Sequence, residues 1–462
     1  MTAKKQAVVV VHGIGEQQPM QTIRDFVEAV WKDDDNLENP QFWNKPSTVS
    51  NSFEQRRLTT DTPLLRSSQT PVRSRIDFYE YYWAHQTVGS NWQHVKDWLY
   101  TLVWCPPWKY KNHPKSIQRL WYFTWAIVLI VLLSVVVFSY CSKQIEQLVG
   151  PWAIILAAVI NFFFTVALVY VQWKIVKYVG DVARYVRAEP ENISIRQAIR
   201  EGGIDLLERI HQTGDYDRII LVGHSLGSII AYDLLNHLWA RHNKFKNPQN
   251  DNKATALSAQ SIVLLNQLQQ LATECGTPNF KQQEYRTLQQ QLFSQLCQDA
   301  PAANWLISDF ISLGSPLTYA DFLLFDNEEQ FRQRKLDREY PTSPPVPDNS
   351  HFYYSEAGQY FLHHAAVFAP VRWTNLYMQH SMFYKGDIIS GPVSRFFSYQ
   401  NTTNPEDIQT PTDIGNTPIQ EIELPWKDIY NGFCHTLYWE KSRTKPGVSS
   451  HLQQLRKALS IY

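Results

Sequence analysis

Short runs of apolar residues recur along the chain and predict strands buried inside a sheet. Residues 7–11 read Ala-Val-Val-Val-Val, and residues 218–222 read Arg-Ile-Ile-Leu-Val. Runs this short, with turn residues at their ends, are typical of strands that are covered on both faces. Helical spacing of apolar residues appears at 195–211 and from Ser228 onward. Further strands are expected at 77–84, 305–313 and 371–377.

Two much longer apolar stretches lie between these predicted strands. Residues 120–141 and residues 147–173 contain no charged side chain, and only the link 142–146 separates them. As a helix, the first stretch is about 33 Å long, enough to cross a bilayer core of about 30 Å. Tryptophan and tyrosine residues at the outer ends suit a membrane interface. The pattern predicts a transmembrane helical hairpin, with a pair of long buried helices or an apolar lid as the alternative.

Basic residues are distributed unevenly around this predicted hairpin. Four precede the first span and two follow the second, whereas the link carries only Lys143, beside Glu146. The positive-inside rule therefore places the rest of the chain in the cytoplasm. The segment 98–108 is rich in tryptophan and tyrosine, and either lies on a lipid surface or forms an aromatic packing cluster.

Because a hairpin returns the chain to the side that it left, the strands before and after it can join one sheet. We expect residues 1–97 to begin a domain, residues 98–178 to form a membrane insertion, and residues 179–462 to complete the domain. Residues 254–300 include a Leu- and Gln-rich segment with helical spacing. That segment forms either a cap over a pocket or a solvated helical hairpin.

Composition narrows the class of protein. The 462 residues are 44% hydrophobic, so the chain can bury a large core. Forty-three basic residues balance 43 acidic ones, so nothing indicates a nucleic-acid partner. The five cysteines are scattered, with no CxxC pair, which favours a reducing compartment and provides no zinc-site spacing. No signal peptide precedes the first predicted strand. The oligomeric state is not predicted.

The pentapeptide Gly223-His224-Ser225-Leu226-Gly227 is the strongest chemical signal. It joins a predicted buried strand to a predicted helix through a tight turn, as a nucleophile elbow requires. Gly223 and Gly227 leave room for the strand and the helix to approach each other. The alternative is a glycine-rich turn without chemistry.

A second glycine-rich turn, His12-Gly13-Ile14-Gly15, follows the first predicted strand. It could belong to a dinucleotide-binding loop, but Gln18 stands where the third glycine of that motif is required. Together, V-V-V-V-H-G and I-I-L-V-G-H-S-L-G-S resemble the lipase/esterase branch of the α/β-hydrolase superfamily.

That resemblance implies an α/β fold with a mostly parallel sheet flanked by helices, and the two transmembrane helices predicted above are inserted into it. It also implies a triad in the order Ser, Asp or Glu, His, with Ser225 as the nucleophile. His12 and Gly13 support the oxyanion loop, and the backbone N–H groups of Ile14 and Leu226 form the oxyanion hole. Neither a metal nor an organic cofactor is required.

The acid and the base of the triad must then follow Ser225. Asp387 lies in a glycine-bounded turn after a predicted strand, where the superfamily carries its acid, and Asp321, Asp326 and Asp413 are competitors. His435 lies in a late aromatic segment, similar to the histidine loop of many such hydrolases. His451 is its competitor, whereas His380 precedes the proposed acid and has the wrong order.

These inferences combine into an expected function. The chain is expected to be a membrane-anchored serine hydrolase with two spans and a cytoplasmic catalytic domain. It would cleave an ester, of a lipid, through an acyl-enzyme on Ser225. A thioesterase, an amidase or an acyltransferase would use the same residues. A membrane scaffold that keeps the fold without activity is the alternative from another class.

Overall fold

The computed structural model describes most of the chain outside the predicted membrane insertion. The described residues are 5–13, 18–47, 49, 56–87, 190–242, 256–299, 305–324, 328–381, 385–399, 413, 415–442 and 450–462, with isolated positions between 121 and 186. Residue contacts divide the chain into two units. Unit 1 comprises Met1–Gln86 and Ile193–Tyr462, and unit 2 comprises Thr87–Asn192. The insertion predicted from the sequence, residues 98–178, lies within unit 2.

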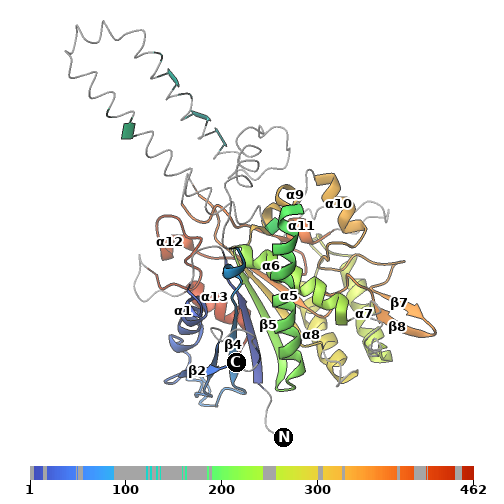
Figure 1. Cartoon of the computed structure of the whole chain (residues 1–462). Coiled ribbons are helices and arrows are strands. Elements are labelled where there is room, and N and C mark those ends of the chain that lie inside the picture. Colours follow the sequence, from blue (N-terminus) through green and yellow to red (C-terminus); the bar gives the residue numbers. More distant parts are fainter. Residues whose placement is uncertain are drawn as a thin grey trace, which may run out of the picture. The chain divides into compact units, whose positions relative to one another are not determined.

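Within the described residues, eight strands of unit 1 form one mixed, mostly parallel sheet (Figure 1). Their order is β10-β9-β6-β5-β1-β4-β3-β2; all neighbours from β10 to β4 are parallel, whereas β3 and β2 are antiparallel. The strands are β1 (Lys5–Val11), β2 (Phe42–Pro46), β3 (Arg56–Thr60), β4 (Ile76–Tyr81), β5 (Tyr216–His224), β6 (Ile307–Leu313), β9 (Arg372–Tyr377) and β10 (Gln420–Glu423).

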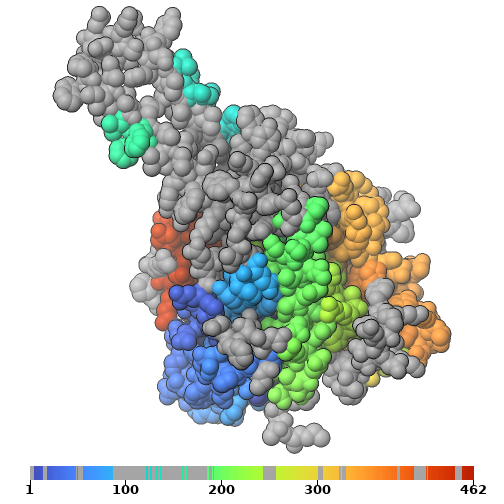
Figure 2. Space-filling model, viewed as in Figure 1, coloured from blue at the N-terminus to red at the C-terminus, as the bar shows by residue number. Residues whose placement is uncertain are grey.

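Helices cover both faces of this sheet, so unit 1 has the expected α/β architecture. One face packs against α1 (Gln21–Val27), η1 (Glu28–Lys32), α12 (Trp426–Ile429) and α13 (Ser450–Leu459). The other face carries α5 (Pro190–Gln212), α6 (Leu226–His242) and α8 (Gln282–Asp299), which contact β4, β5 and β9. In Figure 2 the green residues of α5 and α6 lie between blue N-terminal segments and orange segments from the last third of the chain.

The strands at the two edges of the sheet were not expected. β2 (Phe-Trp-Asn-Lys-Pro) and β10 (Gln-Glu-Ile-Glu) contain no buried residue, so they lack the buried apolar run that predicts strands such as β1 and β5. The separate hairpin β7 (Tyr353–Glu356) and β8 (Gln359–Leu362) was also unexpected. Shorter helical elements are η2 (Ala84–Thr87), η4 (Pro316–Tyr319), α9 (Ala320–Leu323), α10 (Glu328–Leu336) and α11 (Ser394–Phe397).

The Leu- and Gln-rich segment forms two packed helices, α7 (Ala259–Ala272) and α8. Gln289 of α8 donates hydrogen bonds to the carbonyls of Phe368 and Val371, and Arg286 donates to Trp373. These partners lie before β9 or at its start. These hydrogen bonds of α8 therefore lie at the amino end of β9, opposite the carboxyl ends where ligands bind in such sheets.

The predicted spans 120–141 and 147–173 lie mostly outside the described residues. Among the residues that are described, no helix has both the length and the apolar character needed to cross a bilayer.

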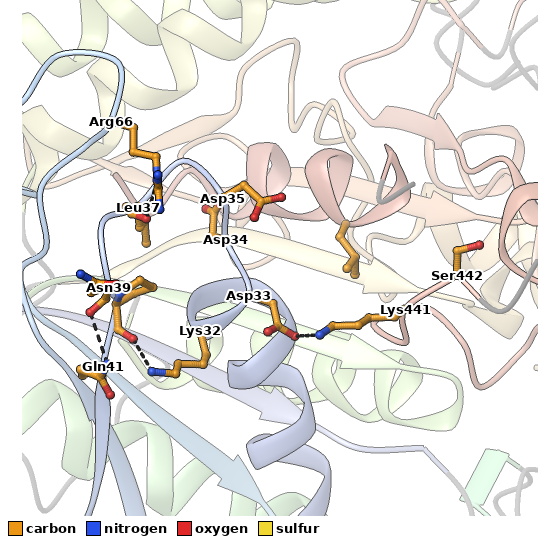
Figure 3. A pocket seen from close by; sticks show the side chains of 12 residues that line it. Lys32, Asp33, Asp34, Asp35, Leu37, Asn39, Gln41, Arg66, Lys441 and Ser442 are labelled. Atoms are coloured by element: carbon orange, nitrogen blue, oxygen red, sulfur yellow. Dashed lines mark hydrogen bonds and ion pairs between the residues drawn. The ribbon is translucent and has the colours of Figure 1, made fainter. Parts of the chain in front are cut away.

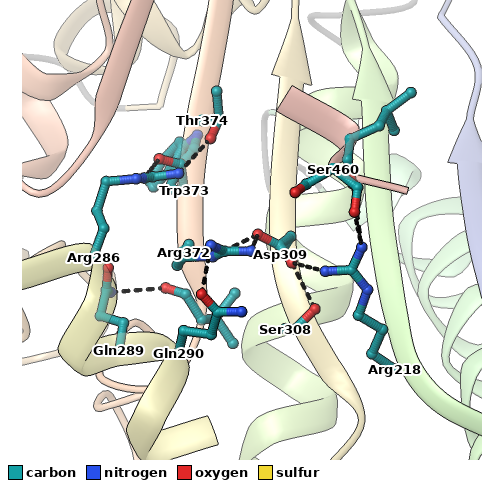
Figure 4. Close-up of polar contacts among 12 residues, drawn as sticks. Arg218, Arg286, Gln289, Gln290, Ser308, Asp309, Arg372, Trp373, Thr374 and Ser460 are labelled. Atoms are coloured by element: carbon teal, nitrogen blue, oxygen red, sulfur yellow. Dashed lines mark hydrogen bonds and ion pairs between the residues drawn. The ribbon is translucent and has the colours of Figure 1, made fainter. Parts of the chain in front are cut away.

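A buried carboxylate links three strands at the amino end of the sheet (Figure 4). Asp309 of β6 accepts hydrogen bonds from Arg372 of β9 at 2.7 and 2.8 Å, and lies 3.7 Å from a guanidinium nitrogen of Arg218 on β5. Ser308 donates to the second oxygen of the same carboxylate at 2.6 Å. Arg218 also donates to the carbonyl of Ser460, which fastens the C-terminal segment to the sheet.

Replacing Asp309 by Asn should leave two partly buried arginines without their anion. We expect the free energy of unfolding, measured with urea, to fall by about 3 kcal/mol. Asp205→Asn is the control, because Asp205 forms an exposed pair with Arg209 on one helix, and pairs of that kind contribute less than about 0.5 kcal/mol. If both variants lost the same small amount of unfolding free energy, the structural role of Asp309 would be contradicted.

Candidate active site

Ser225 occupies a strained turn between the central strand β5 and helix α6. Its φ of +53° lies in the left-handed region, which is unfavourable by about 1–2 kcal/mol for a residue with a Cβ. The Ser225 N–H donates to the carbonyl of Leu313 at 2.9 Å, which extends the pairing of β5 with β6. The Ser225 carbonyl accepts from the amide of Ser228 at 2.9 Å and from its hydroxyl at 2.6 Å. The strained residue is therefore held on both sides by backbone groups.

Glycines surround this turn because the backbones approach each other too closely for a side chain. A Cβ at Gly227 would lie 2.2 Å from the carbonyl oxygen of Val11, at the end of β1. A Cβ at Gly223 would lie 2.5 Å from a backbone atom of α6. A Cβ at Gly13 would lie 2.7 Å from the Cβ of Ser225, so the loop after β1 touches the nucleophile position. The three glycines singled out in the sequence are therefore sterically required.

One of the two predicted oxyanion-hole donors is placed by the structure. Leu226 is the first residue of α6, and its amide makes no hydrogen bond to another described residue. The first amides of a helix lack intrahelical partners and carry partial positive charge, which suits an oxyanion. Ile14 lies outside the described residues, although its neighbour Gly13 contacts Ser225.

The structure brings Ser225, His435 and Asp387 into one hydrogen-bonded line. His435 Nε2 is 2.7 Å from Ser225 Oγ, and His435 Nδ1 is 2.9 Å from Asp387 Oδ2. All three side chains are buried. Because an ionised carboxylate can only accept, Nδ1 carries the imidazole proton and Nε2 is free to accept the proton of the serine hydroxyl. This is the arrangement in which a serine can act as a nucleophile.

Backbone pairing brings the acid and the base together, although they are far apart along the chain. Gly386 donates its N–H to the carbonyl of Gly432 at 2.9 Å, and its carbonyl accepts from the amide of Cys434 at 2.9 Å. Asp387 and His435 directly follow this bridge. Gly386 has a φ of +83°, a conformation that favours glycine. The turn that carries the acid is therefore fixed to the loop that carries the base.

Asp387 is fully buried and is held by donors on both carboxylate oxygens. Oδ2 also accepts from the hydroxyl of Tyr438 at 2.8 Å, and Oδ1 accepts from the amide of Ile389 at 2.8 Å. Burial would raise the pKa of Asp387, but the charge of His435 and hydrogen bonds from neighbouring side chains more than offset burial and lower that pKa. The carboxylate is therefore an anion at neutral pH.

His224, the second residue of the pentapeptide, supports the loop of His435. Burial lowers the pKa of His224 to about 3, so its ring is neutral at physiological pH. Its Nε2–H donates to the backbone carbonyl of His435 at 2.9 Å, and its ring packs edge-on against Trp439. Sequence reasoning assigned no role to His224 or Tyr438, because their partners are distant along the chain.

His12 fastens the end of β1 to the segment after β4. Burial lowers its pKa to about 4, so the ring is neutral. Nδ1–H donates to the carbonyl of Gly13 at 2.7 Å, and Nε2 accepts from the amide of Trp83 at 3.3 Å. The Trp83 indole in turn donates to the His12 carbonyl at 2.9 Å.

The structure places the other candidates for the acid and the base of the triad elsewhere. His451 is bonded to the carbonyl of Glu440 at 2.7 Å, at the start of α13. Asp413 accepts from the side chain of Asn416, and Asp321 lies in the short helix α9. Asp326 lies outside the described residues.

A pocket of about 530 Å³ lies beside the turn after η1 (Figure 3). Lys441 extends to Asp33 across it at 2.9 Å. Its lining includes none of the three hydrogen-bonded residues Ser225, Asp387 and His435. This pocket therefore contributes no group to the hydrogen-bonded line at the nucleophile turn.

The crowding at Gly227 can be tested by substitution. Gly227→Ala should lower the free energy of unfolding in urea by about 3 kcal/mol or prevent folding, because the new Cβ meets backbone rather than a movable side chain. Gly358→Ala is the control, since Gly358 has a positive φ but open space around it, and we expect a loss of about 1–2 kcal/mol. A loss at Gly227 no larger than at Gly358 would contradict the close approach.

No family model matches the chain, and no match was found among curated proteins or solved structures. The α/β fold with its mostly parallel sheet is therefore established from the coordinates alone, and any assignment of function depends on the geometry of the site.

Proposed function

We propose that the protein is a serine hydrolase of the α/β-hydrolase type, related to lipases and esterases, that cleaves an ester. The observation that carries this proposal is the line from Ser225 Oγ through His435 to Asp387, with hydrogen-bond distances of 2.7 and 2.9 Å. Ser225 also lies on a strained strand-to-helix turn that follows β5, a central strand of the mostly parallel sheet. Catalytic sites of such sheets lie at the carboxyl ends of the strands.

The proposed reaction begins with attack of Ser225 Oγ on the ester carbonyl. His435 Nε2 takes the hydroxyl proton as the new C–O bond forms, and Asp387 stabilises the resulting imidazolium. The tetrahedral intermediate collapses when the bond to the leaving alkoxide breaks and His435 returns the proton to that oxygen. Water then attacks the acyl-enzyme by the same proton transfers and releases the acid and Ser225.

The negative oxygen of the intermediate needs donors that are already in place. In the proposal the amide of Leu226 is one donor and the amide of Ile14 is the other. Loss of a donor of this kind typically slows catalysis by about 10²–10³-fold. Every step uses only groups of the chain and water.

Exposed apolar side chains support a membrane location for unit 2. The described positions within both predicted spans are helical, and seven apolar residues among them are 42–66% exposed. Such a surface is unfavourable in water and suits a hydrocarbon environment. We therefore infer a two-span membrane hairpin with a cytoplasmic hydrolase unit. These side chains are Leu129, Leu132, Leu133, Val136, Val159, Phe162 and Phe163.

The connections to the insertion support a lipid as substrate. Trp83 and η2 follow the carboxyl end of β4, and Trp83 is hydrogen-bonded to His12 at the carboxyl end of β1. At the other connection, Ile199 of α5 is bonded to Tyr81, the last residue of β4. The described segments of unit 1 that lead toward the insertion therefore contact the carboxyl ends of β1 and β4, on the side of the sheet where Ser225 lies. A hydrolase tethered to a bilayer meets lipid esters at high local concentration.

Two other enzyme activities would use the same groups, and a scaffold without activity would use none of them. If an alcohol replaced water as the acyl acceptor, the enzyme would be an acyltransferase. If a thioester replaced the ester as substrate, the enzyme would be a thioesterase. A scaffold without activity would need no hydrogen-bonded line at Ser225, so the 2.7 Å contact with His435 favours catalysis.

A fluorophosphonate probe tests the proposed nucleophile. Wild-type protein should be labelled, and Ser225→Ala should abolish labelling because the attacking oxygen is gone. Asp387→Asn should slow labelling by about 10⁴-fold, since the imidazole loses the acceptor that fixes its tautomer. Ser261→Ala removes a buried hydroxyl on α7 and should label as wild type. Folded wild-type protein that is not labelled would favour the scaffold.

The proposed topology has its own test. A reporter placed in the link 142–146 should report the side of the membrane opposite to a reporter placed after Tyr462. The reason is that two spans return the chain to the side from which it started. If both reporters lay on the cytoplasmic side, the transmembrane hairpin would be ruled out. The proposed catalytic role of Ser225 would be unaffected.

A further inference from the structure

Tyr438 is a buried residue of the site with no role in the proton transfers described above. Its side chain is 0% exposed, and its hydroxyl lies 2.8 Å from Asp387 Oδ2 and 2.9 Å from Ser390 Oγ. His435 precedes it by three residues and contacts the same carboxylate oxygen. Two donors from one short segment therefore converge on one atom of the proposed acid.

The direction of these hydrogen bonds follows from the charges. Asp387 is an anion and can only accept, so the phenol must donate its proton to Oδ2. Burial and the neighbouring carboxylate raise the pKa of Tyr438 well above its ordinary value, so the phenol stays protonated across the physiological range. Ser390 can donate to the phenol oxygen in turn.

The structure leaves space for this contact at the end of β6. Gly314 has a φ of +59°, and a Cβ there would lie 2.8 Å from a ring carbon of Tyr438 and 3.3 Å from Asp387 Oδ2. A larger residue would push the tyrosine and the carboxylate apart. The contact between Tyr438 and Asp387 therefore requires a glycine at position 314, directly after β6.

We propose that Tyr438 is a positioning residue that holds Asp387 as an anion and fixes Oδ2 toward His435. Donors on both oxygens, from Tyr438 and His435 to Oδ2 and from the amide of Ile389 to Oδ1, prevent the carboxylate from rotating. This inference deepens the proposed function and depends on it for its catalytic consequence. The hydrogen bond to the carboxylate can be tested without activity.

The decisive variant is Tyr438→Phe, which removes the hydroxyl and keeps the ring. Tyr399→Phe is the matched control, because Tyr399 is also buried and donates its hydroxyl to the carbonyl of Pro345 at 2.7 Å. Both variants lose one buried tyrosine hydroxyl. Only Tyr438→Phe removes a donor from Asp387.

The first measurement is the rate of fluorophosphonate labelling against pH. Tyr438→Phe should be labelled about tenfold more slowly at pH 7, as expected when one charge-assisted hydrogen bond is lost. Without this donor the Asp387 carboxylate holds the protonated imidazole more strongly, so the acid limb of the rate profile, where the catalytic imidazole becomes protonated, should move upward. Tyr399→Phe should keep the wild-type rate and profile.

The second measurement is the urea midpoint of unfolding at several pH values. The pKa of Asp387 is lowered in the folded protein, so its stabilisation is present above the unfolded pKa of about 4 and is lost as the pH falls through the folded pKa. The unfolded pKa is the same in both proteins, so the difference in stability between wild type and Tyr438→Phe should narrow as the pH falls through the folded pKa of Asp387, first in the variant and then in wild type. The difference in urea midpoint between wild type and Tyr399→Phe should not change with pH.

The outcomes separate this inference from the proposed function. Normal labelling of Tyr438→Phe with an unshifted acid limb overturns the role of Tyr438 and leaves the hydrolase intact. Failure of wild type to label overturns the hydrolase. In that case a pH-dependent difference in urea midpoint between wild type and Tyr438→Phe still supports the hydrogen bond from Tyr438 to an anionic Asp387. A difference that is constant with pH overturns that hydrogen bond.

Discussion

The site depends on the close approach of two backbones, where the first turn of α6 passes over the end of β1. A Cβ at Gly227 would lie 2.2 Å from the carbonyl oxygen of Val11, so only glycine allows the contact. This approach leaves Ser225 in the left-handed region, with its carbonyl tied to Ser228. The strain is local, whereas the hydrogen bonds that hold it belong to the central strands. The position of the serine oxygen is therefore set by the core of the protein.

The other two residues reach this oxygen by a separate route. β5 lies between β1 and β6 in the middle of the sheet, so turns that follow the outer strands can fold back toward its carboxyl end. The backbone bridge at Gly386 couples the turn of Asp387 to the loop of His435. His224 then holds the carbonyl of His435. The serine and the imidazole thus depend on each other through the main chain as well as through their side chains.

Sequence patterns predicted the interior of the sheet and not its edges. β1 and β5 contain runs of buried apolar residues, and β6 and β9 are mostly buried, whereas β2 and β10 contain no buried residue. The pentapeptide around Ser225 identified the turn because its chemistry is local. The contact between Tyr438 and Asp387 could not be predicted, because the two residues are 51 positions apart and meet only through the fold. Ile14 and most of the predicted spans lie outside the described residues.

The central claim is that Ser225 forms a covalent bond with an acyl group during turnover. The most direct test is peptide mass spectrometry of protein quenched in acid while it hydrolyses an activated short-chain ester. Acid stops deacylation because the imidazole is then protonated and cannot activate water. The account predicts an added acyl mass on the peptide that contains Ser225, and none on that peptide from Ser225→Ala. Turnover with no adduct, or with the adduct on another residue, would contradict it.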